Sequence, residues 1–356
     1  MTDILIIGAG KIGGAIAYLL HHSGRYNVTV ADINNHNFPS LEQENIQTKV
    51  LDIENTIALE SLIQNFKMVL NAGPFFINIK VATAAAKTKT HYFDLSEDVA
   101  TTDFLKELAQ TSTSSFMPQC GLAPGYISIV GYHLAKQFDS IESVKLRVGA
   151  LPMYPTNTLK YNLTWSTDGL INEYCNPCDA IVEGKKIKVQ PLEGYELFSL
   201  DGVEYEAFNT SGGLGSLAEV LDGKAQNIDY KTARYFSHRD ILKTLLFDLG
   251  FKDNRAPLKK AFEDHLPFTA QDIVLTFVSV TGKIKDRLEQ KIITKKIYNQ
   301  NVGNKHFTAI QLTTASSACA VIDMHVNQQL PHQGFIKQED VDYDNYIQNP
   351  FSKCYQ

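Results

Sequence analysis

Three glycines near the start of the chain, Gly8, Gly10 and Gly13, have the spacing of a turn that can hold a phosphate group. They follow the apolar run Ile4–Ile7, which suits a buried parallel strand, and they open an apolar helix. Gly8 would permit the tight turn, Gly10 would let the backbone approach a pyrophosphate, and Gly13 would let the helix lie close on the strand. The free N–H groups that begin the helix would then face the phosphate. This stretch therefore predicts a dinucleotide site.

An acidic residue, Asp32, follows Gly13 by nineteen residues and ends a second apolar strand, Val28–Ala31. The separation is close to the roughly 20 residues expected for an acid that binds the ribose hydroxyls. A carboxylate there would repel the 2′-phosphate of NADP, and none of the next five residues is an arginine. We therefore expect NAD rather than NADP. His36 is the residue that would favour NADP. The alternative, a strand–helix turn without a ligand, leaves Asp32 unexplained.

The first 121 residues alternate short apolar strands with helical stretches, a pattern typical of a doubly wound parallel sheet. In such sheets ligands bind beyond the carboxyl ends of the strands, so the residues that follow each strand are the candidates. The residues expected to bind the cofactor are Gly8, Gly10, Lys11, Ile12, Gly13, Asp32, Asp52, Ile53, Asn71, Ala72, Gly73 and Pro74.

The 356-residue chain has the composition of a soluble globular protein, with 44% hydrophobic and 20% charged residues. Its formal net charge is −6 and its basic residues are scattered, which argues against binding to nucleic acid or to an acidic membrane. Neither a signal peptide nor the ~20 apolar residues of a membrane helix is evident, so we expect a cytoplasmic protein. Cys175 and Cys178 lack a second ligand pair, and we expect no metal.

The length indicates about two domains at the usual ~150 residues each. We expect an α/β protein whose Rossmann domain covers residues 1–138 and is completed by a helix over residues 307–330. Residues 139–306 are expected to form an α+β domain with a mixed open sheet, which would bind the substrate and serve dimerisation. Residues 331–356 are expected to pack back as a tail.

Six separated stretches have a more specific meaning when they are taken together. They are Gly8–Gly13, Asn71–Phe76, Tyr92–Ser96, Gly121–Gly125, Asn209–Gly213 and Tyr230–Tyr235. In this order they resemble the saccharopine dehydrogenase-like family, and most of all its lysine 6-dehydrogenase members. The resemblance covers almost the whole chain.

The resemblance implies a Rossmann domain, a central substrate and dimerisation domain, and an active cleft between them. It also implies oxidation of a carbon–nitrogen bond, with hydride passing from the carbon that bears the amine to the nicotinamide. For lysine the imine would hydrolyse to a semialdehyde and ammonia, whereas saccharopine would release glutamate or lysine.

This chemistry requires a group that accepts the proton of the amine and activates water. Asp94 and Glu97 follow an expected strand end, and Asp94 is our candidate for contact with substrate or cofactor. Its other role would be to cap the following helix, but Ser96 is the better cap and leaves Asp94 free.

An amino-acid substrate also carries an α-carboxylate, which a bidentate arginine holds best. Arg234 lies in the Tyr230–Tyr235 stretch and is our choice for this role, with a solvated strand-face arginine as the alternative. Lys231 lies on the opposite face of a regular strand, so one of the two has a structural role, and Lys231 could otherwise accept the proton. His238 is a candidate proton shuttle. The family commonly has Pro-Gly where this chain has Phe236-Ser237, so the turn before His238 could differ.

Other residues could complete the substrate site. Thr210, Ser211 and Gly212 precede an expected helix and could offer hydroxyl and N–H groups to a carboxylate, or could simply cap that helix. Tyr161 and Trp165 could wall the pocket, although packing in the core is the commoner role of such aromatic residues.

Three functions remain open on the sequence. The first is an NAD-dependent dehydrogenase acting on L-lysine, and the second has the same fold but acts on saccharopine. The additional carboxylates of saccharopine would need more cations, which Arg147, Lys160 and Arg239 could supply. The third is a binding module that senses NAD without turnover.

Overall fold

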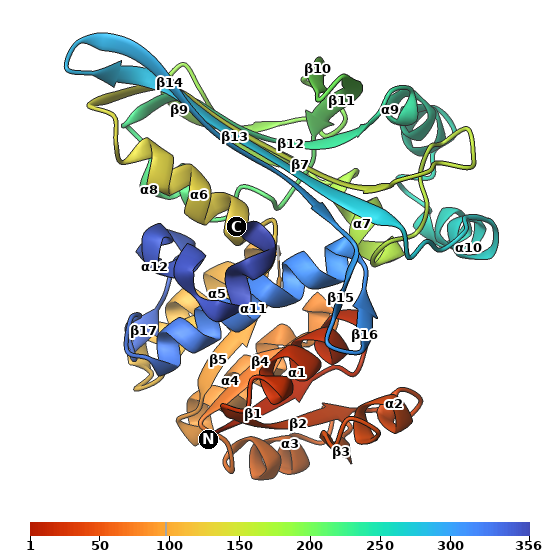
Figure 1. The fold of residues 1–356 in the computed structure, drawn as a ribbon, viewed down its shortest axis with the longest axis vertical. Helices are drawn as coiled ribbons and strands as arrows, with labels where there is room; N and C mark the ends of the chain where they lie inside the picture. The colour runs from red at the N-terminus through yellow and green to blue at the C-terminus, as the bar shows by residue number, and fades with distance from the viewer. Residues whose placement is uncertain (97) are drawn as a thin grey trace. The chain divides into compact units, whose positions relative to one another are not determined.

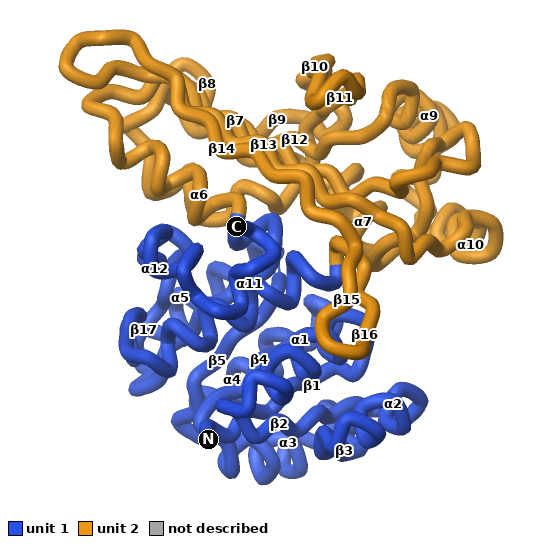
Figure 2. Tube along the Cα trace, viewed as in Figure 1, with its two compact units in different colours: residues 1–126, 311–356 blue, residues 127–310 orange. Residues whose placement is uncertain are grey.

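The computed structural model describes residues 1–96 and 98–356, and the chain divides into two compact units (Figure 2). Unit 1 comprises Met1–Tyr126 and Gln311–Gln356, and unit 2 comprises Ile127–Ile310. Glu97, one of the acidic residues named above, lies outside the described residues. No helix of the described chain is long and apolar enough to cross a bilayer.

Unit 1 is built on a seven-stranded sheet in the order β17-β6-β5-β4-β1-β2-β3, and every strand pair in it is parallel. The doubly wound parallel sheet expected from the sequence is confirmed. The strands are β1 (Thr2–Ile7), β2 (Tyr26–Asp32), β3 (Gln47–Val50), β4 (Met68–Asn71), β5 (His91–Asp94), β6 (Ser115–Met117) and β17 (Gly334–Phe335). The edge strand β17 was not expected, because two residues are too short to show a period.

Helices cover both faces of this sheet (Figure 1). On one face α3 (Thr56–Ile63), α4 (Asn78–Thr88) and α5 (Val99–Thr111) pack their apolar residues against alternate positions of the strands. The other face holds α1 (Lys11–His22) and α11 (Ala309–Val326), which meet where the Cys319 thiol reaches the carbonyl of Ile16. Short helices complete the unit, namely α2 (Phe38–Glu42), α12 (Tyr343–Gln348), and the 3-10 turns Phe75–Ile77, Gln338–Asp340 and Pro350–Tyr355.

The register of the parallel strands brings their carboxyl ends to one edge of the sheet. Ile7 on β1 stands beside Ala31 on β2 and beside Asn71 on β4, and Asn71 in turn stands beside Asp94 on β5. The turns that follow these four residues therefore lie next to one another. This edge is where an open α/β sheet binds its ligands.

Unit 2 contains an eight-stranded mixed sheet, as expected, with the order β10-β11-β12-β7-β13-β14 and with β8 and β9 attached beside β12. Only β7 and β12 pair in parallel, and the other strand pairs are antiparallel. The strands are β7 (Ser140–Pro152), β8 (Cys178–Val182), β9 (Lys185–Val189), β10 (Glu196–Leu200), β11 (Val203–Asn209), β12 (Ala225–Tyr235), β13 (Asp272–Ile284) and β14 (Arg287–Tyr298), with a separate hairpin of β15 (Gln300–Val302) and β16 (Lys305–Phe307). Dimerisation through this sheet stays a prediction.

The helices of unit 2 are short. They are α6 (Tyr126–Ala135), α7 (Thr167–Glu173), α8 (Leu217–Val220), α9 (His238–Lys243), a π-helical turn over Thr244–Asp248, and α10 (Arg255–His265). Residues from α7, α9 and α10 form a core cluster with Tyr161 and Phe208. This cluster surrounds the substrate candidates that are described below.

Candidate functional site

Two of the three glycines in the first turn are required by the chain itself. Gly8 has a φ of 106°, and a Cβ there would lie 2.9 Å from the backbone of Ala72. A Cβ on Gly13 would lie 1.9 Å from the carbonyl oxygen of Gly8. Gly10 differs, because it is exposed, its φ is −70°, and no atom of the described chain lies within 4 Å of the Cβ position. The open space over Gly10 fits a pyrophosphate that approaches the backbone closely.

The side chain of Asp32 is hydrogen-bonded to this turn. Its carboxylate accepts a hydrogen bond of 2.7 Å from the amide of Ala9 and one of 2.9 Å from the amide of Asn34. The side chain of Asn37 donates to the carbonyl of Ala9, at 2.9 Å, which holds the turn from the other side. The half-buried carboxylate thus stands beside the glycine turn, where a ribose would meet it.

The other cofactor candidates occupy the same edge. Ala72 packs against Gly8 and Gly13, and the side chain of Asn71 accepts a hydrogen bond of 3.0 Å from the amide of Gly73. Pro74 follows as an exposed residue. Asp52 and Ile53 follow β3 at the margin of the sheet, with Asp52 exposed and Ile53 half-buried, and Lys11 and Ile12 begin α1.

Asp94 is fully buried at the end of β5, where its carboxylate has three internal donors. The hydroxyl of Tyr92 lies 2.9 Å from it, and the amides of Ser96 and Gln119 lie at 2.8 and 3.3 Å. Burial raises the pKa of Asp94 to about 6, although these hydrogen bonds act in the opposite direction. The carboxyl group therefore has a pKa suited to proton transfer, but it holds two loops together rather than facing open space.

The capping assignment made from the sequence was wrong. Asp98, not Ser96, caps helix α5, and its carboxylate accepts from the amide of Thr101 at 2.7 Å. Ser96 instead accepts from the amide of Asp98, at 3.0 Å. Asp98 suits the capping position because its carboxylate reaches the free amides of the first turn and is stabilised by the helix dipole.

In unit 2, Arg234 lies at the end of β12 and is only 2% exposed. Its Nε donates to the hydroxyl of Tyr174 at 3.0 Å, and its Nη1 donates to the carbonyl of Ala233 at 3.0 Å. The guanidinium carbon lies 5.3 Å from the centre of the Tyr161 ring and 5.9 Å from that of Tyr174. Arg234 forms no ion pair within the described residues, although the buried Glu173 lies close enough to act on its charge. Burial alone would lower the pKa of Arg234, but Tyr174, Tyr161 and Glu173 raise it. A buried guanidinium that forms hydrogen bonds but no ion pair favours an incoming anion.

Tyr174 connects Arg234 to His238 through a chain of hydrogen bonds with a fixed direction. The Nδ1 of His238 lies 3.0 Å from the carbonyl of Leu159, which can only accept, so Nδ1 carries the proton. The Nε2 atom then accepts from the Tyr174 hydroxyl at 3.1 Å, and that same oxygen accepts from Arg234. The tyrosine thereby fixes one edge of the guanidinium and leaves Nη2 without a hydrogen bond to any described residue.

These contacts argue against the proton-shuttle role that the sequence suggested for His238. Both ring nitrogens are engaged, the residue is 1% exposed, and burial followed by the charge of Arg234 lowers its pKa to about 3. The imidazole stays neutral near pH 7 and serves to hold Tyr174. The turn before it keeps a glycine-like shape, since Ser237 has a φ of 84°.

Lys231 lies on the opposite face of β12 and belongs to another cluster. Its Nζ lies 2.9 Å from Glu196 and 3.2 Å from Asp229. The same two carboxylates pair with Arg147, which is also 2% exposed. Burial alone would raise the pKa of Glu196, but Arg147 and Lys231 lower it to about 2. Lys231 is therefore a partner in an ionic cluster, on the face of β12 opposite to Arg234.

The stretch Thr210–Gly212 adopts a loop beside the Arg234 site. The amide of Ser211 donates to the carbonyl of Glu173, at 3.1 Å, next to Tyr174 in the chain. Thr210 shares a buried hydrogen bond of 2.7 Å with Thr232, and Gly212 has a φ of 88°. The expected helix is reduced to the four residues of α8, so it offers no extended helix N-terminus to a carboxylate.

Tyr174 was not among the predicted site residues. The sequence could have predicted the helix α7 that precedes Tyr174. Ser166 caps this helix by accepting a hydrogen bond of 3.2 Å from the amide of Gly169. The buried pair Leu170 and Ile171 then continues a helical pattern. The period could have located the helix, but it could not have shown that the tyrosine reaches Arg234.

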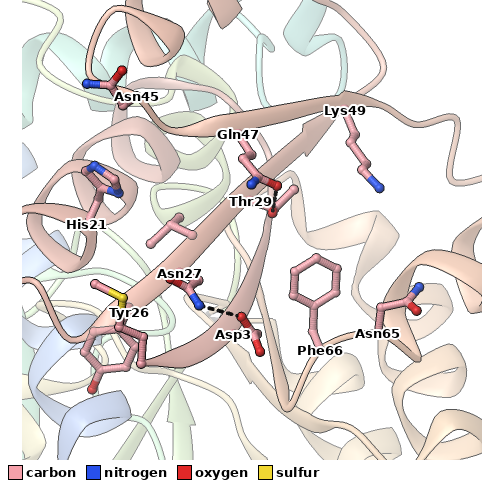
Figure 3. Close-up of a pocket in the computed structure, with 12 residues that line it drawn as sticks. Asp3, His21, Tyr26, Asn27, Thr29, Asn45, Gln47, Lys49, Asn65 and Phe66 are labelled. Carbon is pink, nitrogen blue, oxygen red and sulfur yellow. Dashed lines mark hydrogen bonds between the residues drawn. The ribbon is translucent and has the colours of Figure 1, made fainter.

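Unit 1 also contains a hollow of about 440 Å³ at a different place (Figure 3). Polar side chains line it, and among them Asn27 donates to Asp3 at 2.9 Å. Its lining includes residues from the amino halves of β1 and β2, together with Gln47 and Lys49 of β3. Because ligands of an open α/β sheet bind at the carboxyl edge, we assign this hollow no part in the chemistry.

Two models of one known protein family match the chain. A model of the saccharopine dehydrogenase NADP binding domain matches residues 4–116, and one of the saccharopine dehydrogenase C-terminal domain matches residues 121–354. The chain belongs to the saccharopine dehydrogenase family. The resemblance drawn from the motifs is confirmed at this level, and likeness to lysine 6-dehydrogenase stays a prediction. Unit 1 thus carries the family's pyridine nucleotide-binding domain.

Individual relatives are distant. The mitochondrial alpha-aminoadipic semialdehyde synthase of Mus musculus is 22% identical over 194 residues, which cover 52% of this chain and 21% of that protein. The Bos taurus protein of the same name is 21% identical over 315 residues, which cover 83% of this chain and 33% of that protein. This member of the saccharopine dehydrogenase family therefore spans a third or less of the length of these relatives.

Solved structures share the fold over nearly the whole chain. Saccharopine dehydrogenase (L-Glu forming) from Saccharomyces cerevisiae, in its apo form, has a TM-score of 0.80 at 16% identity and covers 98% of this chain and 96% of its own. Homospermidine synthase from Legionella pneumophila, in complex with NAD, has a TM-score of 0.68 at 13% identity and covers 99% and 89%. At these identities the likeness concerns the fold alone.

The geometry at Gly10 makes a testable prediction for nucleotide binding. Gly10→Ala should lower the affinity for the nucleotide about tenfold or more, because the methyl group enters space that the chain leaves open, and tenfold is about 1.4 kcal/mol. The melting temperature should not fall, since alanine adopts a φ of −70° without strain. Titration of nucleotide by calorimetry and a thermal melt would measure both effects. Gly13→Ala is the control, and it should destabilise the fold; unaltered nucleotide affinity in Gly10→Ala would contradict the assignment.

Proposed function

We propose that the protein is an NAD-dependent oxidoreductase that oxidises the carbon–nitrogen bond of an amino acid, with L-lysine as the substrate. The observation that carries this proposal is the buried guanidinium of Arg234, which has aromatic neighbours, is held at Nε and Nη1, and forms no ion pair with the described residues. An α-carboxylate bound by Nη1 and Nη2 would neutralise it in the bidentate geometry that arginine favours. The family membership supports the reaction class.

Each group of residues has a separate task in this proposal. Gly10 and Asp32 hold the pyrophosphate and the ribose of NAD, which supplies a hydride acceptor when it is bound. Arg234 binds the carboxylate, and Tyr174 together with His238 keeps the guanidinium in one orientation. The overall reaction converts the ε-ammonium form of lysine, NAD⁺ and water into the semialdehyde, ammonium, NADH and one proton.

The amine must lose a proton before its carbon can yield a hydride. Of the three candidate acceptors, His238 and Lys231 are both engaged in internal contacts. Asp94 is likewise held by three internal hydrogen bonds, but burial raises its pKa to about 6, and we retain it as the proposed acceptor.

The charge distribution of unit 2 supports lysine over saccharopine. Arg147 pairs with Glu196 and Asp229, and Arg239 pairs with Glu193 and Asp240. These two arginines therefore serve carboxylates of the chain itself. The half-buried Lys160 donates to the carbonyl of Phe236 at 3.0 Å. Saccharopine, with its additional carboxylates, would find fewer partners in this unit.

Saccharopine remains the second candidate, because the yeast saccharopine dehydrogenase shares the fold at a TM-score of 0.80. One assay separates the candidates. The purified protein would receive NAD with L-lysine and, separately, with saccharopine, while reduced cofactor, ammonia and free glutamate are measured. Ammonia released from lysine is the expected result. Release of glutamate or lysine from saccharopine alone would replace lysine by saccharopine, and cofactor binding without turnover would indicate a sensing module.

Asp32 should determine the choice between NAD and NADP. Asp32→Ser removes the charge that repels a 2′-phosphate and should narrow the ratio of kcat/KM for NAD over NADP about tenfold. Initial rates with each cofactor would measure this ratio. Asp3→Ser is the matched control, because Asp3 lies at the amino end of β1, away from the carboxyl edge, and its carboxylate accepts a hydrogen bond from Asn27. A ratio that is equal in wild type and Asp32→Ser would remove Asp32 from the selection.

A further inference from the structure

Three histidines from separate parts of unit 1 form a cluster away from the nucleotide edge. His91 begins β5, His325 lies in the last turn of α11, and His332 lies in the connection to β17. One ring nitrogen from each lies within 4.8 Å of the other two. The rings of His325 and His332 are stacked at 4.2 Å between centres, and the His91 ring stands against them, edge-on to His325.

The cluster contains a buried nitrogen with no partner. His325 is 1% exposed and its Nε2 lies 2.8 Å from the hydroxyl of Ser115, but its Nδ1 has no hydrogen bond in the described chain. The Nε2 of His332 lies 2.8 Å from the carbonyl of His325, which can only accept, so a neutral His332 keeps a lone pair on Nδ1. A buried polar atom without a partner is rare in folded proteins and indicates an unfilled interaction.

The electrostatic surroundings suit a cation. The cluster stands at the carboxyl end of α11, where the unpaired carbonyls and the helix dipole give a negative potential. The Ser115 hydroxyl lies 2.8 Å from the Nδ1 of His91 and 2.8 Å from the Nε2 of His325, so the other nitrogen of each ring would meet the ion. Metal-ligating histidines commonly donate their second ring N–H in this way, and for His91 this tautomer gives up the 3.2 Å contact from the Ser115 amide. Imidazole nitrogens without carboxylates select Zn²⁺, Co²⁺, Ni²⁺ or Cu²⁺ rather than Mg²⁺ or Ca²⁺.

Metal binding requires a small closure of the cluster. With Zn–N bonds of about 2.0–2.1 Å, nitrogens around a tetrahedral ion lie about 3.3 Å apart, which is closer than the 4.8 Å limit of this cluster. Stacked rings cannot both point their lone pairs at one ion, so one of them must turn. His332 can do so because it is exposed, and it would give up its single hydrogen bond to His325.

We propose that His91, His325 and His332 bind one divalent transition-metal ion, with Zn²⁺ as the natural choice and with water completing the coordination. The three ligands come from the sheet, from the helix α11 and from the chain that leads to β17. An ion held by them would fasten the C-terminal segment to the central sheet. We expect its role to be structural. His91 lies at the amino end of β5, whereas the nucleotide edge lies at the carboxyl ends of the strands.

Purified wild-type protein, treated with chelator and dialysed, would be titrated at pH 7.5 with Zn²⁺ by calorimetry and with Co²⁺ by visible absorption. We expect one equivalent of either ion to bind, with the intense absorption of tetrahedral Co²⁺. The melting temperature should rise with Zn²⁺ because the ion binds the folded state, and it should not rise with Mg²⁺. Absence of binding to the wild type would overturn the proposal.

His332→Ala tests the ligand set with little risk to the fold, because the side chain is exposed. It should weaken Zn²⁺ binding at least about tenfold, since even the loss of an outer-shell partner weakens a metal site about 10- to 100-fold. His265→Ala is the matched control, an exposed histidine at the end of α10 in unit 2, and it should bind Zn²⁺ as the wild type does. Equal Zn²⁺ affinity in wild type and His332→Ala would overturn the assignment.

Discussion

Arg234→Met is expected to lower kcat/KM for the amino-acid substrate roughly a hundredfold or more, mainly through a higher KM. Loss of one partner of a buried, hydrogen-bonded charge pair costs about 2–5 kcal/mol in binding, and each 1.4 kcal/mol is a factor of ten. The stability of the free protein should change by no more than about 1 kcal/mol. The reason is that Arg234 forms no ion pair within the described chain, so its removal breaks only its hydrogen bonds to Tyr174 and Ala233.

Steady-state kinetics and a urea titration would measure the two effects in the same preparation. Tyr174→Phe is an informative companion, because it removes the hydroxyl that accepts from Arg234 while keeping the ring. It should raise KM by less than Arg234→Met does. If Arg234→Met has the kinetics of the wild type, Arg234 does not bind the substrate and the proposed site fails.

Arg147→Met is expected to give the opposite result. Arg147 is as deeply buried as Arg234, but it pairs with Glu196 and Asp229. Its removal leaves Lys231 as the remaining cation that pairs with Glu196 and Asp229 in this cluster. Removing one partner of a buried ion pair costs about 3–5 kcal/mol of stability. At about 2–4 °C per kcal/mol for a chain of this kind, the melting temperature should fall by roughly 10 °C.

The control for this prediction is the double variant Arg147→Met with Glu196→Gln. Neutralising the stranded carboxylate should restore part of the lost stability, whereas independent effects would add. KM for the amino acid should stay within about twofold of the wild type, because Arg147 and Arg234 belong to different clusters. A melting temperature equal to that of the wild type would contradict the assigned role of Arg147.

The two arginines show what a sequence pattern can and cannot predict. A period of two places Lys231 and Arg234 on opposite faces of β12, and the structure gives them different partners. The pattern does not show which face carries the ionic cluster. Glu196, which supplies the carboxylate for Lys231, arrives from β10, and its position depends on how that strand pairs in the sheet.

The acid–base candidates show the same limit. The sequence places Asp94 at a strand end and His238 just after the Tyr230–Tyr235 stretch, and the structure ends β5 at Asp94 and β12 at Tyr235. Their suitability for proton transfer depends on neighbours from other segments, such as Gln119 for Asp94 and Leu159 for His238. A histidine whose two nitrogens are engaged differs in chemistry from a free one, although both have the same place in the sequence.

The sequence by itself determined the nucleotide turn, the doubly wound sheet and the family, because these depend on short-range geometry. Gly8 and Gly13 are needed where a strand turns into a helix, and Asp32 stands at the end of the next strand. The tertiary structure alone decided that Arg234 is buried against Tyr161, that Tyr174 orients it, and that three distant histidines meet. The physical reason is that charge compensation and metal ligation depend on which side chains lie within a few ångströms. That proximity is set by the packing of the fold and not by spacing along the chain.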